Sequence, residues 1–158
     1  MFKIADFDDL QAIIEFSKVL KAQNARMSFT DFDEVNYVNA QLNSPLVTLF
    51  IAYDKGEIVA MFRGVRGEGL KSHSVYIACA VKKSHRQKGL ATKITNYALN
   101  IFKKESILIA RTKIYSWNKA SIATILKCGF EESGRVVMHE YFEETDDYID
   151  DLIFHKKL

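Results

Sequence analysis

The chain has 158 residues, of which 48% are hydrophobic and 27% are charged, and its formal net charge at pH 7 is +2. This length and apolar content are typical of one globular domain with a sizeable core, and they exclude a disordered chain. The nearly balanced charge argues against a surface devoted to binding nucleic acid.

The hydrophobic pattern predicts strands and helices along the whole chain. In the first half we expect a strand at 1–5, helices at 8–23 and 32–42, and a hairpin of strands 48–53 and 58–64. In the second half we expect a strand at 74–81, a helix at 89–103, a strand at 107–115, a helix at 118–128 and a closing hairpin of strands 136–142 and 148–156. The segments 24–31 and 65–73 are polar or glycine-rich and are expected to be loops.

These elements follow the order β-α-α-β-β-β-α-β-α-β-β. The order predicts an α/β (α+β) fold with a mixed, mostly antiparallel sheet of about seven strands and helices on both faces. Strand 74–81 is apolar almost throughout, so we expect it in the middle of the sheet with both faces covered. No linker or repeat divides the sequence, so we expect a single domain over residues 1–158.

The two cysteines and the N-terminal segment indicate the compartment. Cys79 and Cys128 lie far apart in apolar runs, so we expect buried free thiols in a reducing environment. The first residues lack the pattern of a secretory signal peptide, and no apolar run reaches membrane-spanning length. We therefore expect a cytoplasmic protein without membrane contact.

The segment 81–92 (VKKSHRQKGLAT) carries the strongest functional signal. It follows the apolar strand and opens a predicted helix, where free N–H groups and the helix dipole attract anions. Gly89 and Ala91 leave room for a ligand close to the backbone, so the segment predicts a phosphate-binding loop. The nucleotide-triphosphate signature G-x-x-x-x-G-K-[ST] does not occur. The glycine-rich segment 64–69 lacks dinucleotide spacing and leads into a strand, so we interpret it as a hairpin loop.

Residues 86–91 (RQKGLA) match the signature [RQ]-x-x-G-x-[GA], and they do so between a strand and a helix. Residues 118–121 (NKAS) and 127–130 (KCGF) look like the N-x-x-A and G-F pieces that follow this signature in the same family. The predicted order of elements agrees as well. The chain therefore resembles the GCN5-related N-acetyltransferase (GNAT) family over essentially its whole length.

The resemblance implies acetyl-CoA, or a related acyl-CoA, as acyl donor, and no metal. Backbone amides from Gln87 to Thr92 would surround the pyrophosphate, and the end of strand 74–81 would pair with pantetheine like an added strand. The backbone N–H of Cys79 would polarise the thioester carbonyl, an oxyanion-hole role, while its thiol only packs. Asn118 would cap its helix and also contact the donor. The implied donor-binding residues are Cys79, Ala80, Val81, Arg86, Gln87, Lys88, Gly89, Leu90, Ala91, Thr92 and Asn118.

The sequence departs from the family where proton transfer is concerned. Many members have a tyrosine seven residues after the asparagine to protonate the leaving thiolate, and Ile125 stands there in this chain. Tyr115, Tyr141 or a water molecule are alternative donors. Candidates for a general base, which would deprotonate the acceptor amine, are Tyr76, His73, His139 and Glu140, and the sequence favours none of them.

The resemblance places the acceptor between segment 24–31 and the loop of the last hairpin. An anionic loop there would attract a cationic acceptor such as a polyamine, a lysine side chain or an aminoglycoside, while a solvated turn explains the same charges. Aromatic residues nearby, including Phe29, Phe32 and Phe142, fit either a wall of this site or the core. The acidic residues of the hairpin are Glu140, Glu143, Glu144, Asp146, Asp147, Asp150 and Asp151.

The sequence thus predicts an N-acetyltransferase that moves an acetyl group from acetyl-CoA to a primary amine of a small molecule or peptide, by direct attack in a ternary complex. The alternative is a catalytically silent acyl-CoA-binding module, which Ile125 would suit. Nucleic acid is not expected as a partner, because no aromatic and basic RNA-binding pattern accompanies the lysines. A monomer and a homodimer both remain open.

Overall fold

The computed structural model describes residues 1–23 and 26–158. In these residues, seven strands form one mixed sheet in the order β1-β2-β3-β4-β5-β7-β6, and only β4 and β5 run parallel. The strands are β1 (Phe2–Ile4), β2 (Val47–Asp54), β3 (Glu57–Arg66), β4 (Ser74–Val81), β5 (Ile109–Tyr115), β6 (Glu131–Phe142) and β7 (Asp147–Lys157).

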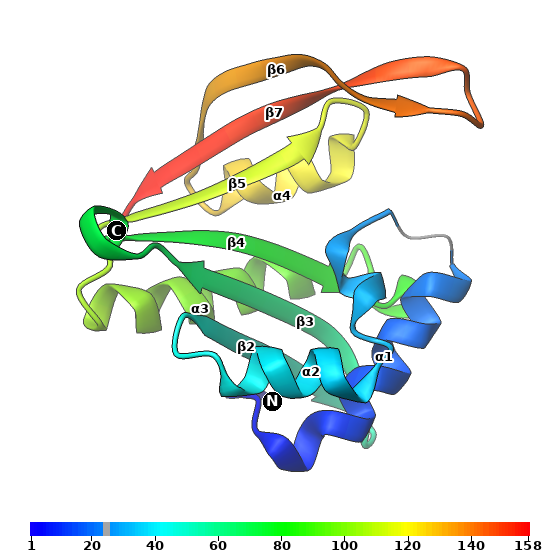
Figure 1. Ribbon diagram of the computed structural model, residues 1–158, viewed down its shortest axis with the longest axis vertical. Coiled ribbons are helices and arrows are strands. Elements are labelled where there is room, and N and C mark those ends of the chain that lie inside the picture. The colour runs from blue at the N-terminus through cyan, green and yellow to red at the C-terminus, as the bar shows by residue number, and fades with distance from the viewer. Residues whose placement is uncertain (24–25) are drawn as a thin grey trace.

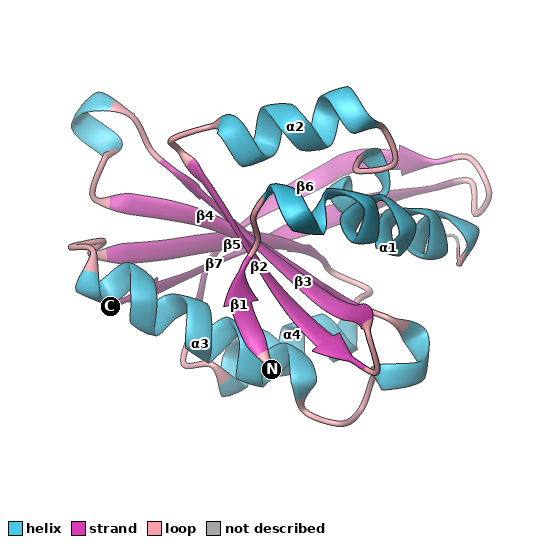
Figure 2. Ribbon diagram, turned by 90° about the horizontal axis from the view of Figure 1, so that it is seen from below, coloured by secondary structure: helices cyan, strands magenta, loops and turns pink. Residues whose placement is uncertain are grey.

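Helices cover both faces of the sheet (Figure 2). They are α1 (Leu10–Ala22), α2 (Val35–Asn43), α3 (Leu90–Lys104) and α4 (Lys119–Lys127). One buried apolar cluster joins the sheet to α3 and α4, and it includes Phe50 and Phe102. A second cluster joins the opposite face to α1 and α2, and it includes Leu20, Phe29 and Phe32. The predicted fold class and element order are therefore confirmed.

Several predicted boundaries differ from the structure. The second helix starts at Val35 because Ser28–Asp31 forms a short 3₁₀ helix capped at Phe32. Strand β6 starts at Glu131, five residues early, since its first residues are polar and are ordered by pairing with β7. Of the loop expected at 24–31, residues 24 and 25 lie outside the described residues.

Strands β4 and β5 pair over only three residues of each strand, Ser74–Tyr76 with Ile109–Arg111. Beyond this point they diverge, as Figure 1 shows. The hydroxyl of Thr112 donates a hydrogen bond of 2.9 Å to the carbonyl of Ile77, where a continued strand would have placed an N–H. The second half of β4 therefore has a pairing partner only on the β3 side.

One side chain of β4 is exposed. Tyr76 is 40% exposed, although β4 is the central strand of the seven. The prediction that both faces of this strand are covered is therefore wrong at Tyr76. A cavity lined by residues of both β4 and β5 lies at the widening between these strands.

We predict that Gly64→Ala lowers the free energy of unfolding by about 1–3 kcal/mol, because it overpacks a filled core. A Cβ on Gly64 of β3 would lie 2.3 Å from Cζ of Phe102, whose ring is fully buried. Gly134→Ala is the control, since its Cβ would meet nothing closer than Ile153 Cδ1 at 3.6 Å. Urea denaturation measures both variants, and equal stability of the two would contradict the packing described here.

Candidate active site

Near the end of β4, the backbone of Cys79 lies beyond the residues that pair with β5. Gly67 N donates to Ser74 O (3.0 Å) and Lys82 N donates to Val59 O (2.9 Å). These two bonds show that every second residue from Ser74 to Lys82 turns its N–H and C=O towards β3. Because donors alternate along an antiparallel pair, the N–H and C=O of Cys79 point the other way, towards β5. Since β5 has diverged there, the Cys79 N–H faces the gap between the strands.

The loop after β4 turns its backbone towards the same gap. Gln87 and Gly89 both adopt left-handed conformations, with φ of 62° and 71°. Gly89 is also the N-cap of α3, and no side chain caps that helix, so its first N–H groups stay open to a ligand. A left-handed turn before a helix start forms a concave set of amides that suits an anion.

Side chains of this loop brace it. Arg86 donates from Nε to the carbonyl of Val81 at 3.0 Å, and Lys88 donates from Nζ to the carbonyl of Ser84 at 3.1 Å. Lys82, at the start of this loop, pairs with Glu57 at 2.6 Å. The loop therefore offers its backbone amides more directly than its lysines.

A cavity of about 1050 Å³ lies along the end of β4, the start of α3 and one side of α4. We call it the larger cavity. Of the eleven residues that the sequence assigned to donor binding, ten line it and Lys88 does not. Asn118 reaches it from the start of α4, where its Oδ1 accepts a hydrogen bond of 3.1 Å from Ser121 N. The predicted capping role of Asn118 is confirmed.

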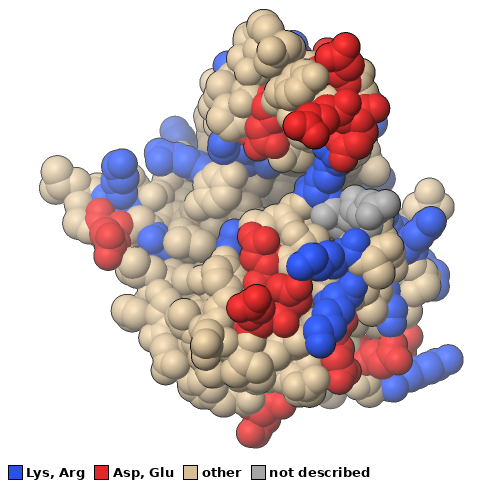
Figure 3. Space-filling model, turned by 45° about the vertical axis from the view of Figure 1, so that its right-hand side comes forward, with Lys and Arg blue, Asp and Glu red and all other residues tan. Residues whose placement is uncertain are grey.

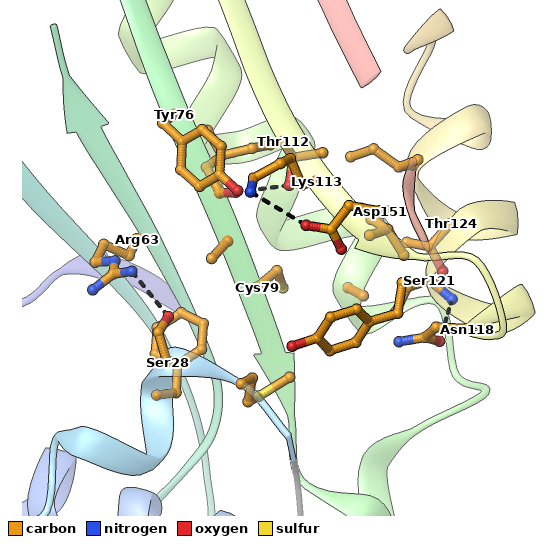
Figure 4. A pocket seen from close by; sticks show the side chains of 18 of the residues that line it. Ser28, Arg63, Tyr76, Cys79, Thr112, Lys113, Asn118, Ser121, Thr124 and Asp151 are labelled. Atoms are coloured by element: carbon orange, nitrogen blue, oxygen red, sulfur yellow. Dashed lines mark hydrogen bonds and ion pairs between the residues drawn. The ribbon is translucent and has the colours of Figure 1, made fainter. Parts of the chain in front are cut away.

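A second cavity of about 330 Å³, the smaller cavity, meets the larger one at Cys79, which lines both. Its volume is at the lower end of the range for small-molecule sites. Figure 4 shows its two sides, with Arg63 and Ser28 on one side of Cys79 and Asn118 and Ser121 on the other. Several polar residues line the smaller cavity and not the larger one, among them Arg63, Tyr76, Lys113, Tyr115, Glu140 and Asp151.

Two of the predicted proton-transfer candidates meet in the smaller cavity. The hydroxyl of Tyr115, at the end of β5, donates to Oε2 of Glu140 on β6 at 2.7 Å. Burial, together with the Glu140 carboxylate, raises the pKa of Tyr115 above its ordinary value, so the phenol stays protonated at neutral pH. The buried carboxylate of Asp151 lies beside Lys113 Nζ at 3.2 Å and His139 Nε2 at 3.5 Å. Neither His73 nor Tyr141 lines this cavity.

The side chains of Ile125 and Cys79 contribute no reactive group. Ile125 is 7% exposed and lines the smaller cavity with carbon alone. Burial raises the pKa of the Cys79 thiol to about 12, so it is not a nucleophile at neutral pH. Cys128 is buried and its pKa is raised by burial too, and both thiols are free.

The acidic hairpin is more neutralised than its sequence suggests. Figure 3 shows acidic side chains gathered on the projecting upper part of the molecule, where Figure 1 places β6 and β7. Glu144 pairs with Arg26, Asp150 pairs with Arg135, and Asp146 accepts a hydrogen bond from Tyr141. Only Glu140 and Asp151 of the seven acidic residues line the smaller cavity.

Sequence reasoning missed Arg63. This arginine on β3 stands among buried apolar residues and lines the smaller cavity. The sequence does mark this position, because Arg63 is the one charged residue in the predicted strand 58–64. A charge in such a strand is unusual unless it has a partner or a ligand.

The chain was compared with known proteins. The model of the acetyltransferase (GNAT) family matches residues 15–130. The chain belongs to this family. It is an acetyltransferase by that membership, as the sequence predicted. No curated protein gave a significant match.

Solved structures show the same fold as this GNAT member. A GNAT-family acetyltransferase from Streptococcus pneumoniae superposes with a TM-score of 0.85 at 16% identity, covering 100% of this chain and 99% of the other. The ribosomal-protein-alanine N-acetyltransferase from Brucella melitensis superposes with a TM-score of 0.81 at 18% identity, covering 100% and 99%. An N-acetyltransferase from Staphylococcus aureus Mu50 superposes at 0.81 and 16% identity, covering 99% and 97%.

The described residues were expected to hold neither a membrane-spanning segment nor a metal. Across residues 1–23 and 26–158, none of the helices has the length and hydropathy needed to cross a membrane. The same residues hold no group of three or more histidine, cysteine, aspartate or glutamate side chains placed to bind a metal ion.

Proposed function

We propose that this chain transfers an acetyl group from acetyl-CoA to a primary amine, with the donor in the larger cavity and the acceptor in the smaller one. The observation that carries the proposal is the position of Cys79, whose backbone N–H faces the gap where the two cavities meet. We further propose that residues 1–158 act as one domain in the cytoplasm, where two free thiols are stable.

The residues around the larger cavity fit acetyl-CoA. The open amides after Gly89 suit the pyrophosphate, and the unpaired edge of β4 suits an extended chain that carries amide groups. The volume of about 1050 Å³ is ample for a cofactor of this length. Acetyl-CoA would supply the acetyl group as a thioester, and the chain would hold its carbonyl near Cys79.

The Cys79 N–H would stabilise the negative charge that develops on the thioester oxygen during attack. A fixed backbone dipole is effective here because it needs no reorientation, and burial strengthens it. This role does not depend on the side chain at position 79. The thiol, whose pKa is raised to about 12, only packs.

Tyr115 and Glu140 would remove the proton of the acceptor amine. An alkylammonium ion has a pKa of about 10, so a minor neutral fraction of the amine binds and attacks after its first proton has gone to solvent, and its nitrogen must then lose one more proton to form a neutral amide. The hydroxyl of Tyr115 already donates to Glu140, so its oxygen can accept the amine proton as its own proton passes to the carboxylate.

The coenzyme leaves as a thiolate, which is stable enough without a dedicated acid because a free thiol has a pKa of about 8.5. Ile125 in place of the usual tyrosine is compatible with this scheme.

Isothermal calorimetry with acetyl-CoA tests the donor site. Wild-type protein should bind, and Gly89→Val should weaken binding about tenfold or more, because a branched residue strains a backbone with φ of 71°. Gly69→Val is a matched control, since Gly69 has φ of 54° but lies outside both cavities. Absence of wild-type binding at millimolar acetyl-CoA would sink the proposed function.

We predict that Tyr115→Phe and Glu140→Gln each lower kcat about 100-fold or more while acetyl-CoA affinity stays unchanged. Steady-state kinetics with an accepted amine, followed by thiol release, measures the effect. Tyr141→Phe is the control, because Tyr141 makes a similar bond to Asp146 at 3.0 Å but lies outside the smaller cavity. Wild-type kcat in both variants would rule out the proton relay. Binding of acetyl-CoA without turnover on any amine would instead favour a silent acyl-CoA-binding module.

A further inference from the structure

Arg63 is the one cationic side chain of the smaller cavity that has no carboxylate partner among the described residues. The other two, Arg26 and Lys113, pair with Glu144 and Asp151. Among residues 1–23 and 26–158, Arg63 makes a single hydrogen bond, from Nη2 to the neutral hydroxyl of Ser28 at 2.9 Å. Its Nε is buried and has no hydrogen-bond partner in the same part of the chain. A guanidinium has five N–H donors, so most of its binding capacity is unused.

The packing around Arg63 holds this charge in place. Its guanidinium lies 5.8 Å from the ring centre of Phe29 and 5.7 Å from that of Phe32, and both rings are fully buried. The segment that carries Ser28 and Phe29 covers it from the α1 side. A partly buried cation without a counter-ion costs stability unless a ligand supplies the negative charge. Such a feature is expected where an anionic ligand binds.

The charge balance of the lining also disfavours a strongly cationic acceptor. Three cationic side chains line the smaller cavity, against the two carboxylates of Glu140 and Asp151. Asp151 is already engaged with Lys113 and His139, and Glu140 accepts from Tyr115. A polyamine would place its second ammonium group in a cavity where the one lining carboxylate without a cationic partner among the described residues, Glu140, would already serve as the proton acceptor.

We propose that the acceptor is a small α-amino acid, whose carboxylate binds Arg63 and Ser28 while its amine faces Cys79 and the Tyr115–Glu140 pair. This inference rests on the proposed function and names its substrate class. The planar guanidinium matches a carboxylate with two parallel hydrogen bonds, which a lysine at this position could not provide. The amine nitrogen forms the new amide bond, the carbon–sulfur bond of the thioester breaks, and the amine proton passes through Tyr115 to Glu140. The acceptor carboxylate is unchanged.

The experiment compares amino acids with their decarboxylated amines, each pair sharing one side chain. We expect kcat/KM of the wild type to be at least about tenfold higher for the amino acid of an accepted pair. Arg63→Gln should lower kcat/KM about 10- to 100-fold for the amino acid, mainly through KM, and should leave the decarboxylated amine nearly unaffected. Arg63→Lys should lose part of the preference, because it keeps the charge without the planar fork.

A matched control removes another arginine from the same strand. Arg66 pairs with Glu105 and lines neither cavity, so Arg66→Gln should keep the wild-type preference.

The inference is overturned if decarboxylated amines are the better acceptors, or if Arg63→Gln slows both members of a pair equally. It also falls if acetyl-CoA binds but no amino acid is acetylated. That outcome differs from failure of the proposed function, in which acetyl-CoA itself does not bind. The comparison of wild-type substrates needs no variant, so misfolding of Arg63→Gln does not spoil the test.

Discussion

The early end of pairing between β4 and β5 is the constraint on which the rest of the site depends. Only three residues of each strand pair, and the Thr112 hydroxyl then occupies the Ile77 carbonyl as β5 turns away. A strand whose backbone loses its neighbour must satisfy its N–H and C=O groups in another way. The end of β4 is thus a sheet edge inside the molecule, and both cavities meet in the widening beside it.

The two cavities differ in the groups that they offer. Backbone dominates the larger one, through the edge of β4 and the amides that follow Gly89. Side chains dominate the smaller one, through Arg63, the Tyr115–Glu140 pair and the Lys113–Asp151 pair. Backbone groups depend less on residue type, apart from positions such as Gly89 whose φ of 71° favours glycine, so the proposed donor site would tolerate many changes in sequence. Acceptor choice depends on particular side chains, and a family can change it while keeping its donor site.

Local patterns were enough to predict the order of the strands and helices and the part of the larger cavity's lining that lies at the end of β4 and the start of α3. Hydrophobic periodicity reports each element, and segment 86–91 is a contiguous motif whose conformation depends on its own glycine. Features that depend on distant contacts were not predictable in the same way. The contact of Tyr115 on β5 with Glu140 on β6, for example, follows from the pairing of β7 with both of these strands. Arg63 is the one charged residue of its predicted strand. That no described carboxylate pairs with it follows only from the positions of the neighbouring acidic side chains in the structure.

The role of the Cys79 amide is tested most directly by a titration of ¹⁵N-labelled protein with acetyl-CoA, followed by amide chemical shifts. We expect the largest changes at the Cys79 amide, at Val81 and across residues 87–92. Changes should be smaller at Ala78 and Ala80, whose N–H groups bond to β3. Saturating acetyl-CoA that leaves the Cys79 amide unmoved while other surfaces respond would contradict the account.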